Sequence, residues 1–297
     1  MSAPVSVVIP SLDDPGLLDA CLAALLPELA RRGAGDEVVV VDDGTGTLAA
    51  HLAGRDAALR VLELPANVGF ARALLAGAEA ARHDLLLALN PDVVVRPGSL
   101  EPLVETLERD PGTALVAPCV LHGEAASPGE ETLPELVFEG GMHRVRPSAL
   151  EVTPGEAHPD HPGGVPAGFA LGGAMLARRA ELLAEPFDRR YEPFYWEDVD
   201  LAERARAAGR RVLVDPRSVV VHLGRGTIGA RVPEVLVRAA IERNRLLFTW
   251  KHERDPARLA AHFEALAARL VEHALDGERE ELLWLLLALE RDAGAGA

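Results

Sequence analysis

Four short polar segments of this 297-residue chain follow four predicted strands, each at the point where its strand ends. Ligands of open parallel sheets bind at the carboxyl ends of the strands. Carboxylates in such places suit two tasks, which are accepting hydrogen bonds from a base or ribose and holding a hard divalent cation that bridges phosphates. A nucleoside diphosphate requires both tasks. The segments are Ser11-Leu12-Asp13-Asp14, Asp42-Asp43-Gly44-Thr45, Asn67-Val68-Gly69-Phe70-Ala71-Arg72 and Asn90-Pro91-Asp92.

Each of these segments, taken singly, is also an acceptable turn or helix cap. The first of them lacks the GxGxxG pattern, which argues against a dinucleotide-binding dehydrogenase. The succession of four such segments at four strand ends is what indicates a nucleotide site.

Three further polar segments lie in the second half of the chain. Glu197, Asp198 and Asp200 open a predicted helix, where the macrodipole favours acids, so helix capping alone explains one of the three. Asp200 is interpreted as the structural carboxylate of the group. His222 closes a predicted strand, and a core histidine is its alternative interpretation. The segments are Gly172-Gly173-Ala174-Met175, Phe194-Tyr195-Trp196-Glu197-Asp198-Val199-Asp200-Leu201 and Val221-His222-Leu223-Gly224.

The elements that position these residues form an alternating pattern. Short β-branched runs alternate with longer Ala/Leu segments at helical spacing, which is typical of an α/β fold with a mostly parallel sheet flanked by helices. Predicted strands cover residues 5–10, 37–41, 61–64, 85–89, 113–120, 211–214 and 219–222, with a further ordered segment at 170–177. Predicted helices cover residues 16–32, 48–55, 71–81, 99–109 and 199–208.

The middle and the end of the chain depart from this alternation. Residues 122–168 contain 15 Gly or Pro in 47 positions, about twice the average of the chain, which has 49 in 297. They predict a loop-rich, mobile region with one hairpin near 136–145. Helical patterns return at 235–251, 257–274 and 278–290. We expect a nucleotide-binding domain over 1–230 and a helical C-terminal extension over 231–297.

Composition excludes several classes of protein. There are 30 Lys plus Arg against 46 Asp plus Glu, a net charge of −16, so binding to nucleic acid phosphates is not expected. Cys21 and Cys119 are too few for a disulfide framework and are predicted to be buried apolar residues. The start of the chain does not have the pattern of a signal peptide, and no apolar run approaches the ~20 residues that span a bilayer. We expect a cytoplasmic protein.

The ordered set of motifs resembles the family-2 glycosyltransferases of the GT-A fold, over roughly residues 5 to 224. The features are VSVVIPS, VVVDDGT, NVGFARA, LNPDV, GGAMLARR, YWEDVDL followed by RARAAGRRV, and VVHLG. This sequence resembles most the rhamnosyltransferase-like branch of the family, in which the DxD metal motif reads NPD. The resemblance implies a GT-A glycosyltransferase domain with residues 122–168 on the acceptor side.

Residue by residue, the resemblance implies roles for fourteen positions. Asp92 would ligate Mg²⁺ or Mn²⁺ on the donor diphosphate, and His222 would complete that metal site. Asp198 would be the catalytic base. Gly173, Trp196 and Glu197 would lie beside the acceptor or the sugar. The nucleotide site, with Asp42 meeting the base, would be lined by Pro10, Ser11, Asp42, Asp43, Asn67, Gly69, Arg72 and Asn90.

The resulting hypothesis is an inverting, metal-dependent hexosyltransferase. A divalent cation stabilises charge on the departing diphosphate, and a carboxylate deprotonates the acceptor hydroxyl. The expected partners are a dTDP- or UDP-sugar donor and a glycan or lipid-linked saccharide acceptor. Two alternatives stay open, a non-catalytic nucleotide-sugar-binding module and a metal-dependent nucleotidyltransferase. Leu12 and Asp13 depart from the family's usual turn after the first strand, which puts the donor preference in doubt.

Two further sets of charged residues have competing interpretations. Residues 225–258 carry eight Arg or Lys against four Asp or Glu. These side chains are either a solvated helix face or, at Arg243, Arg245 and Lys251, a surface for an acceptor diphosphate or for peripheral contact with the inner face of the cell membrane. His143, His158 and His161 have no ligand spacing and are interpreted as exposed loop residues.

Overall fold

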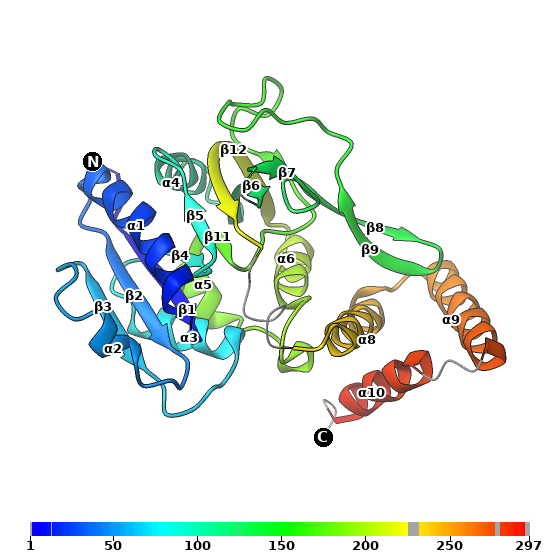
Figure 1. Cartoon of the computed structure of the whole chain (residues 1–297). Coiled ribbons are helices and arrows are strands. Elements are labelled where there is room, and N and C mark those ends of the chain that lie inside the picture. The colour runs from blue at the N-terminus through cyan, green and yellow to red at the C-terminus, as the bar shows by residue number, and fades with distance from the viewer. Residues whose placement is uncertain (1, 13, 124, 225–231, 277–279, 295–297) are drawn as a thin grey trace.

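One sheet runs through the computed structural model, which describes residues 2–12, 14–123, 125–224, 232–276 and 280–294 (Figure 1). The strand order is β10-β12-β6-β11-β4-β1-β2-β3, with β5 paired to β12 and β7 paired to β6. Its strands are β1 (Val5–Ser11), β2 (Glu37–Asp42), β3 (Leu59–Glu63), β4 (Leu85–Leu89), β5 (Val93–Val95), β6 (Thr113–His122), β7 (Ser127–Pro128), β10 (Val165–Pro166), β11 (Ala174–Arg178) and β12 (Arg211–His222).

The long strands of this sheet are mostly parallel. β1 pairs in parallel with β2 and β4, β2 with β3, and β6 with β12. β11 lies between β4 and β6 and runs antiparallel to both. The predicted α/β class is therefore confirmed, and the strand ends at residues 11, 42 and 89–92 meet at one edge of the sheet.

The predicted strands at 211–214 and 219–222 are a single strand, β12, so the prediction of two strands was wrong. The pairing register with β6 shifts between Asp215 and Val219. The buried Asp215 carboxylate accepts hydrogen bonds there from Thr106 Oγ1 at 2.7 Å and from the Arg217 amide at 3.0 Å. Because Asp, Pro and Ser are typical turn residues, the sequence of this bulge predicts a loop between two strands.

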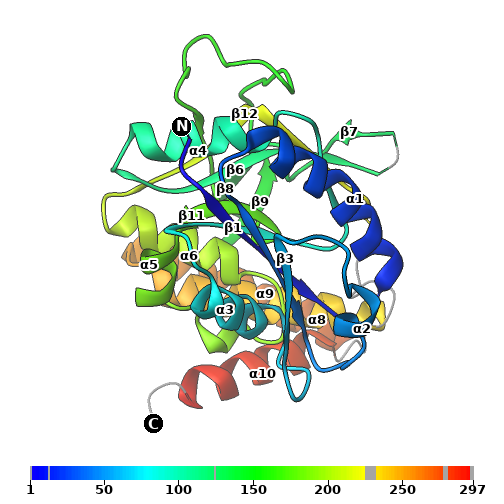
Figure 2. The same ribbon diagram turned by 90° about the vertical axis from the view of Figure 1, so that its left-hand side faces the viewer.

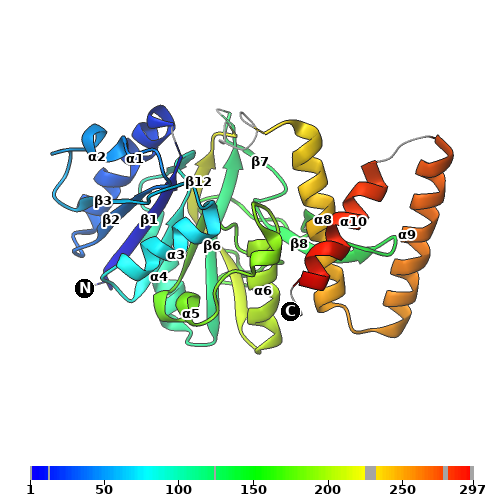
Figure 3. The same ribbon diagram turned by 90° about the horizontal axis from the view of Figure 1, so that it is seen from below.

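Helices cover both faces of the sheet (Figures 2 and 3). One face packs against α1 (Pro15–Arg32), the short α2 (Leu48–His51) and α4 (Leu100–Arg109). The other packs against α3 (Phe70–Ala80), α5 (Arg179–Ala184) and α6 (Glu197–Ala207). Cys21 and Cys119 are buried and free, as predicted.

Three further helices lie at the end of the sheet away from β3 (Figure 3), and they are α8 (Glu234–His252), α9 (Pro256–Asp276) and α10 (Glu280–Gly294). One hydrophobic cluster runs from Val8 and Val41 to Phe248 of α8 and Leu266 of α9. The helices thus pack on the same core as the sheet, and the predicted boundary at 230/231 lies outside the described residues. No described helix has the length and apolar character needed to cross a bilayer.

The loop-rich region holds the predicted hairpin, formed by β8 (Pro134–Glu139) and β9 (Met142–Pro147). Leu133 and Met142 are buried, and a Cβ at Gly141 would lie 2.5 Å from the Ala261 carbonyl of α9. This part of the region is anchored to the helical end of the molecule. The prediction of a loop-rich region with one hairpin is therefore confirmed, whereas its mobility and its place on the acceptor side stay predictions.

Gly77 sets how closely α3 approaches the sheet. A Cβ added there would lie 2.3 Å from Val8 Cγ1 and 2.9 Å from Val41 Cγ2, both within the core. Because β-branched side chains have few allowed χ1 rotamers, Val8 and Val41 cannot easily move to make room for this Cβ. We expect Gly77→Ala to lower the free energy of unfolding by about 1–3 kcal/mol, since overpacking outweighs the ~1 kcal/mol gain in helix propensity. Urea unfolding measures this, with Glu79→Ala on the exposed face of α3 as control. A Gly77→Ala variant as stable as the wild type would contradict the packing argument.

Candidate functional site

The carboxylates after β2 are engaged by the local backbone. Asp42 accepts hydrogen bonds from the Thr45, Thr47 and Leu48 amides at 2.8–3.1 Å and from Thr45 Oγ1 at 2.6 Å. Burial raises the pKa of Asp42, but these hydrogen bonds stabilise the charged carboxylate and hold its pKa below the usual value. The side chains of Asp42 and Asp43 are both buried, and Asp42 caps the start of α2. The contacts of Asp42 are thus those of a helix-capping residue.

Asp43 orders the turn that leads into α3. Its carboxylate accepts hydrogen bonds from the amides of Val68 at 2.7 Å and of Gly69 at 3.1 Å. Asn67 is exposed beside this turn, whereas Ser11 is buried at the end of β1 with no hydrogen-bond partner for its hydroxyl. The backbone of Pro10 continues the β1–β2 pairing opposite Val41. Asp13, two residues after Ser11 in the sequence, lies outside the described residues.

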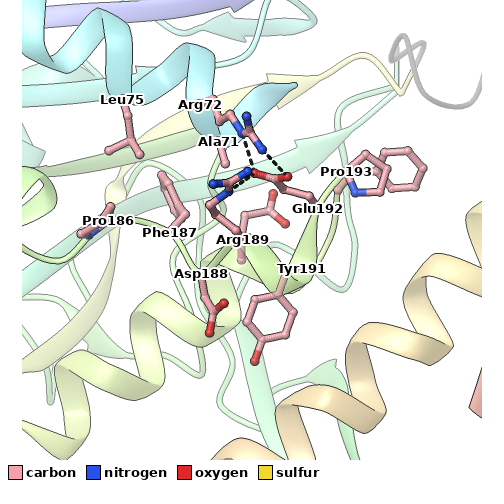
Figure 4. Close-up of a pocket in the computed structure, with 12 residues that line it drawn as sticks. Ala71, Arg72, Leu75, Pro186, Phe187, Asp188, Arg189, Tyr191, Glu192 and Pro193 are labelled. Carbon is pink, nitrogen blue, oxygen red and sulfur yellow. Dashed lines mark hydrogen bonds and ion pairs between the residues drawn. The ribbon is translucent and has the colours of Figure 1, made fainter. Parts of the chain in front are cut away.

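Arg72 pairs with a glutamate that lies shortly before α6. Its guanidinium makes a bidentate ion pair with Glu192, with nitrogen–oxygen distances of 2.7 and 2.8 Å. This pair lies at a pocket of about 280 Å³ between α3 and the segment that leads into α6 (Figure 4). Glu197 also lines this pocket. The structure therefore pairs Arg72 with the segment that leads into α6.

Two adjacent glycines bring the Asn90-Pro91-Asp92 turn next to the acidic start of α6. The Gly173 carbonyl accepts a hydrogen bond from the Asn90 amide at 2.7 Å, and the Gly172 amide donates to Asp198 Oδ2 at 3.0 Å. A Cβ at Gly173 would lie 2.3 Å from Asn90 Nδ2, so only glycine fits there without movement. The predicted residues Asn90, Gly173 and Asp198 are thus brought together.

His222 lies between two carboxylates. Its Nε2 is 3.1 Å from Asp92 Oδ2, and its Nδ1 is 3.2 Å from Glu131 Oε2. Hydrogen bonds to Asp92 and Glu131 raise the pKa of His222 to about 10. His122 lies alongside, with the two imidazole centroids 5.7 Å apart. Asp92 and His222 were predicted as a pair, whereas Glu131 and His122 were missed. One signal was available, since β6 and β12 each end in histidine.

The donor set at His222 fits a divalent cation. Asp92 is buried, and its Oδ1 has no hydrogen-bond partner among the described residues. A buried acceptor without a donor is costly, and a cation would satisfy it. Carboxylate oxygens and imidazole nitrogens are suitable ligands for Mn²⁺, and the oxygens are suitable for Mg²⁺ as well.

Glu197 and Asp198 are half-buried carboxyls at the first turn of α6. Burial, together with the nearby Asp198, raises the pKa of Glu197 to about 8. Burial raises the pKa of Asp198 to about 6, although the amides of Gly172 and Val199 partly offset the effect. A carboxylate with a raised pKa is a stronger base near neutral pH. Glu197 Oε2 has no hydrogen-bond partner in the described part of the chain.

The backbone just before these carboxyls is strained. Tyr195 and Trp196 have φ of 71° and 74°, in the left-handed region that aromatic residues rarely adopt. Asn244 of α8 holds this segment, because its Nδ2 lies 2.8–3.0 Å from the carbonyl oxygens of Tyr191, Phe194 and Tyr195. Strain of about 1–3 kcal/mol per residue persists only where surrounding contacts fix it. Asn244 is one such contact, and no sequence motif identifies it.

A buried charge network joins α6 to α8. Asp200 is fully buried and lies 2.7 Å from both Lys251 Nζ and His252 Nε2, with Arg204 Nε at 2.9 Å. Lys251 also pairs with Asp188 at 2.8 Å. These contacts are those of a structural carboxylate and keep α8 beside the acidic start of α6.

Two predictions need correction, one about the exposed surface of Arg243, Arg245 and Lys251 and one about His143. Arg243 and Arg245 are buried, and Lys251 pairs with Asp188 and Asp200, so none of the three forms an exposed surface. Helical spacing did not reveal that the segment before α6 covers this face of α8. His143 is not an exposed loop residue, because it lies on β9 and its Nδ1 is 3.1 Å from Thr249 Oγ1. His158 and His161 do lie in the loop, partly exposed.

A protein-family model matches the first half of the chain. The model described as "Glycosyl transferase family 2" matches residues 6–155, about half of the chain. Among curated proteins, an N-acetylglucosaminyl-diphospho-decaprenol L-rhamnosyltransferase of Mycobacterium tuberculosis strain H37Rv is 31% identical over 145 residues, and the protein of that name in strain CDC 1551 gives the same values. The match covers 47% of this chain and 47% of the relative, so the chain spans about half the length of the curated relatives it matches.

Several solved structures share the fold. GalNAc-T7 with UDP, GalNAc and Mn²⁺ is similar with a TM-score of 0.63 and 17% identity over 84% of this chain and 48% of that chain. The mannosyltransferase PcManGT from Pyrobaculum calidifontis, in complex with GDP-Man and Mn²⁺, has a TM-score of 0.56 and 16% identity over 99% and 86%. S. aureus TarS 1–349 in complex with UDP-GlcNAc has a TM-score of 0.61 and 15% identity over 96% and 79%.

The role of Asn244 can be tested by removing its donors without changing its shape. Asn244→Asp places a carboxylate against three carbonyl oxygens, so we expect the free energy of unfolding to fall by at least about 1–3 kcal/mol. Glu79→Gln, an exchange between acid and amide at an exposed position of α3, should leave stability within about 0.5 kcal/mol of the wild type. Equal stability of the two variants in urea titrations would remove Asn244 from this role.

The raised pKa of Glu197 predicts a pH-dependent stability. Between its ordinary value of 4.5 and about 8, the folded protein holds a proton on Glu197 that the unfolded chain releases, so this group lowers stability as pH rises. Glu197→Gln removes that effect. We expect the stability of the variant relative to the wild type to increase from pH 5 to pH 8 in urea unfolding with a chelator present. Glu79→Gln, on exposed α3, should give a constant difference. A pH-independent difference for Glu197→Gln would contradict the assignment.

Proposed function

The chain belongs to glycosyl transferase family 2, and on that basis we propose that it transfers a sugar from a nucleoside diphosphate donor to a hydroxyl group of an acceptor. One observation carries the proposal. The backbone groups of Gly172 and Gly173 form hydrogen bonds with Asp198 and Asn90, which brings a half-buried carboxylate next to the ends of β4 and β12, where Asp92 and His222 lie. A proton acceptor and a cation site are the two groups that the reaction needs on either side of the sugar.

Asp92 and His222 would hold the divalent cation of the donor diphosphate. The cation supplies charge stabilisation for the departing diphosphate, whose negative charge grows as the bond to the sugar breaks. Either Mg²⁺ or Mn²⁺ would serve in that role, and the Mn²⁺ present with GalNAc-T7 and PcManGT supports a divalent ion. Asp92 contributes an oxygen that is otherwise unpartnered, and His222 contributes a nitrogen once it has lost its proton.

Asp198 would be the catalytic base. As the acceptor oxygen forms its bond to the anomeric carbon and the carbon–phosphate oxygen bond breaks, the hydroxyl proton passes to Asp198. The Gly172 amide fixes one carboxylate oxygen during this step. A single displacement inverts the anomeric centre, so the proposed reaction is inverting. Glu197, Trp196 and Gly173 would lie beside the sugar or the acceptor.

The nucleotide would lie at the ends of β1, β2 and β3. Pro10, Ser11 and Asn67 line that edge, and the unpartnered Ser11 hydroxyl supports a polar ligand there. Asp42 and Asp43 would shape the site through the turns that they hold, as would Gly69, and Asn90 would lie at its border. Arg72 would have to leave Glu192 to reach a phosphate.

The donor and acceptor remain proposals of class. A dTDP- or UDP-sugar is proposed as donor and a lipid-linked saccharide or glycan as acceptor, supported by the name of the mycobacterial relative, an N-acetylglucosaminyl-diphospho-decaprenol L-rhamnosyltransferase. Peripheral contact with a membrane from the cytoplasmic side follows from a lipid-linked acceptor. It would have to use residues other than the buried Arg243 and Arg245. Residues 1–230 would form the transferase domain and 231–297 the helical extension.

The role of Asp198 can be tested by a nearly isosteric replacement. Asp198→Asn keeps an acceptor for the Gly172 amide but cannot take the proton, so we expect transfer to fall about 10²- to 10⁴-fold while donor binding survives. Turnover is measured with a panel of nucleotide sugars and Mn²⁺, and donor binding by thermal shift. Glu203→Gln, a half-exposed change on the same helix, is the control.

Three outcomes separate the alternatives. Asp198→Asn with turnover within a few-fold of the wild type would exclude Asp198 as the base. A wild type that binds nucleotide sugars without transfer or hydrolysis would favour a binding module. Release of pyrophosphate from a nucleoside triphosphate and a sugar phosphate would favour a nucleotidyltransferase.

A further inference from the structure

The ends of β6 and β12 place two histidines side by side. His122 and His222 are register partners in this parallel pair of strands, and their imidazole centroids are 5.7 Å apart. Glu131 Oε2 lies 3.2 Å from His222 Nδ1 and 3.7 Å from His122 Nε2. One donor atom from each of the three residues lies within 4.8 Å of the others. Glu131 and His122 thus form a cluster with His222 on the side of its Nδ1 atom.

The spacing of these atoms is that of a tetrahedral metal site. Zn²⁺ binds imidazole nitrogen and carboxylate oxygen at about 2.0–2.2 Å, so two of its ligands in a tetrahedral site lie about 3.4 Å apart. Both distances from Glu131 Oε2 are close to that value. His122 Nε2 is buried and lacks a hydrogen-bond partner within the described part of the chain. A buried polar atom without a partner is costly, and a bound cation would remove that cost.

The position of Glu131 is fixed by a short, well-bonded turn. The Gly129 amide donates to Thr132 Oγ1 at 2.7 Å, and the Thr132 hydroxyl donates to the Val120 carbonyl of β6 at 2.6 Å. Thr132 is buried, which anchors the turn to the sheet. A Cβ at Gly129 would lie 2.5 Å from His122 Cδ2, so the turn packs directly on that imidazole. The sheet and this turn therefore hold all three side chains in place.

Asp92 contacts the opposite nitrogen of His222. Its Oδ2 lies 3.1 Å from His222 Nε2, and its side chain is buried. A histidine that binds a metal through one nitrogen usually donates its other N–H to a carboxylate, which fixes the tautomer. With the proton on Nε2 and donated to Asp92, Nδ1 carries the lone pair beside Glu131. Asp92 is thus outside the cluster and orients the imidazole within it.

We propose that His122 Nε2, Glu131 Oε2 and His222 Nδ1 bind Zn²⁺, at a site separate from that of the donor cation. Two imidazoles and one carboxylate favour Zn²⁺ over Mg²⁺, which prefers oxygen ligands. Three protein ligands leave one position of a tetrahedral ion open.

His222 links this site to the donor cation, and this part of the inference rests on the proposed function. A neutral imidazole has one nitrogen with a lone pair and one that carries a proton. The donor cation requires the lone pair on Nε2, beside Asp92, whereas Zn²⁺ requires it on Nδ1. Zn²⁺ at the cluster keeps the proton on Nε2 and withholds His222 from the donor cation. Zn²⁺ therefore inhibits transfer.

The test measures metal binding by the whole chain without any turnover. Co²⁺ replaces Zn²⁺ as a spectroscopic probe, its visible absorption reports the ligands, and titration calorimetry gives the Zn²⁺ affinity. We expect His122→Gln and Glu131→Gln to alter the Co²⁺ bands and to weaken Zn²⁺ binding at least as much as loss of a supporting residue does, about 10- to 100-fold. Glu130→Gln, beside Glu131, and His158→Gln, in the loop beyond β9, are matched controls and should stay within about 2-fold of the wild type.

Asp92→Asn separates the cluster from the donor site. The amide oxygen can still accept the Nε2 proton, so the Co²⁺ bands should keep their shape. The donor cation loses a carboxylate, so Mn²⁺ binding, followed by the free Mn²⁺ signal in electron paramagnetic resonance, should weaken by about 10-fold or more. One equivalent of Zn²⁺ should reduce Mn²⁺ binding in the wild type and much less in Glu131→Gln.

Two measurements guard against a change in folding. Thermal unfolding of each metal-free variant establishes that it is folded. Glu131→Asp, which keeps the carboxylate on a shorter side chain, should bind Zn²⁺ more tightly than Glu131→Gln.

The outcomes separate this inference from the proposed function. Wild-type Zn²⁺ affinity and unchanged Co²⁺ bands in both His122→Gln and Glu131→Gln would overturn the cluster as a metal site and leave the proposed function standing. Altered bands in both variants, with Mn²⁺ binding that Asp92→Asn does not affect, would support the cluster and count against the proposed donor site. Equal displacement of Mn²⁺ by Zn²⁺ in the wild type and in Glu131→Gln would show that Zn²⁺ enters the donor site directly, which would overturn the competition at His222.

Discussion

The hydrogen bonds from one amide group, the side-chain Nδ2 of Asn244, support the backbone conformation on which the acidic end of α6 depends. Its two hydrogens are shared by three carbonyl oxygens, from Tyr191, Phe194 and Tyr195. Between those carbonyls and Glu197, two successive aromatic residues keep positive φ, and this turn directs Glu197 and Asp198 into a half-buried position. Without the donor, the backbone would be expected to relax towards ordinary dihedral angles, and the first turn of α6 would rotate with it.

The contacts of α8 show that this C-terminal helix supports the residues at the start of α6. Lys251 and His252 pair with Asp200 in the first turn of α6. Asn244 and Arg243 donate hydrogen bonds to the backbone that precedes this turn. The same helix packs on the hairpin through His143 and Thr249. The segment that carries Glu131 and the segment that carries Asp198 are thus both braced, directly or through the hairpin, by a helix that follows them in the sequence.

Local patterns predicted those parts of the molecule that local forces determine. Alternating strands and helices gave the α/β class, and polar residues after buried strands located the edge at which Asp92, Asn90 and His222 come together. Partners far apart in sequence were not predictable. Arg72 meets Glu192 across 120 residues, and neither residue type nor spacing identifies that pair. The burial of Arg243 and Arg245 was missed for the same reason, since helical periodicity does not tell which other segment covers a face.

The place of β11 in the sheet has a consequence for the order in which the chain can fold during synthesis. β11 is the one strand that bridges β4 and β6, yet it begins at residue 174, after the hairpin segment. The first four parallel strands can associate as soon as they are made, but β4 then presents an unpaired edge until β11 is complete. An open edge of apolar residues is a template for pairing with another nascent chain. The long interval between β4 and β11 is therefore the period in which misassembly on the ribosome has the greatest opportunity.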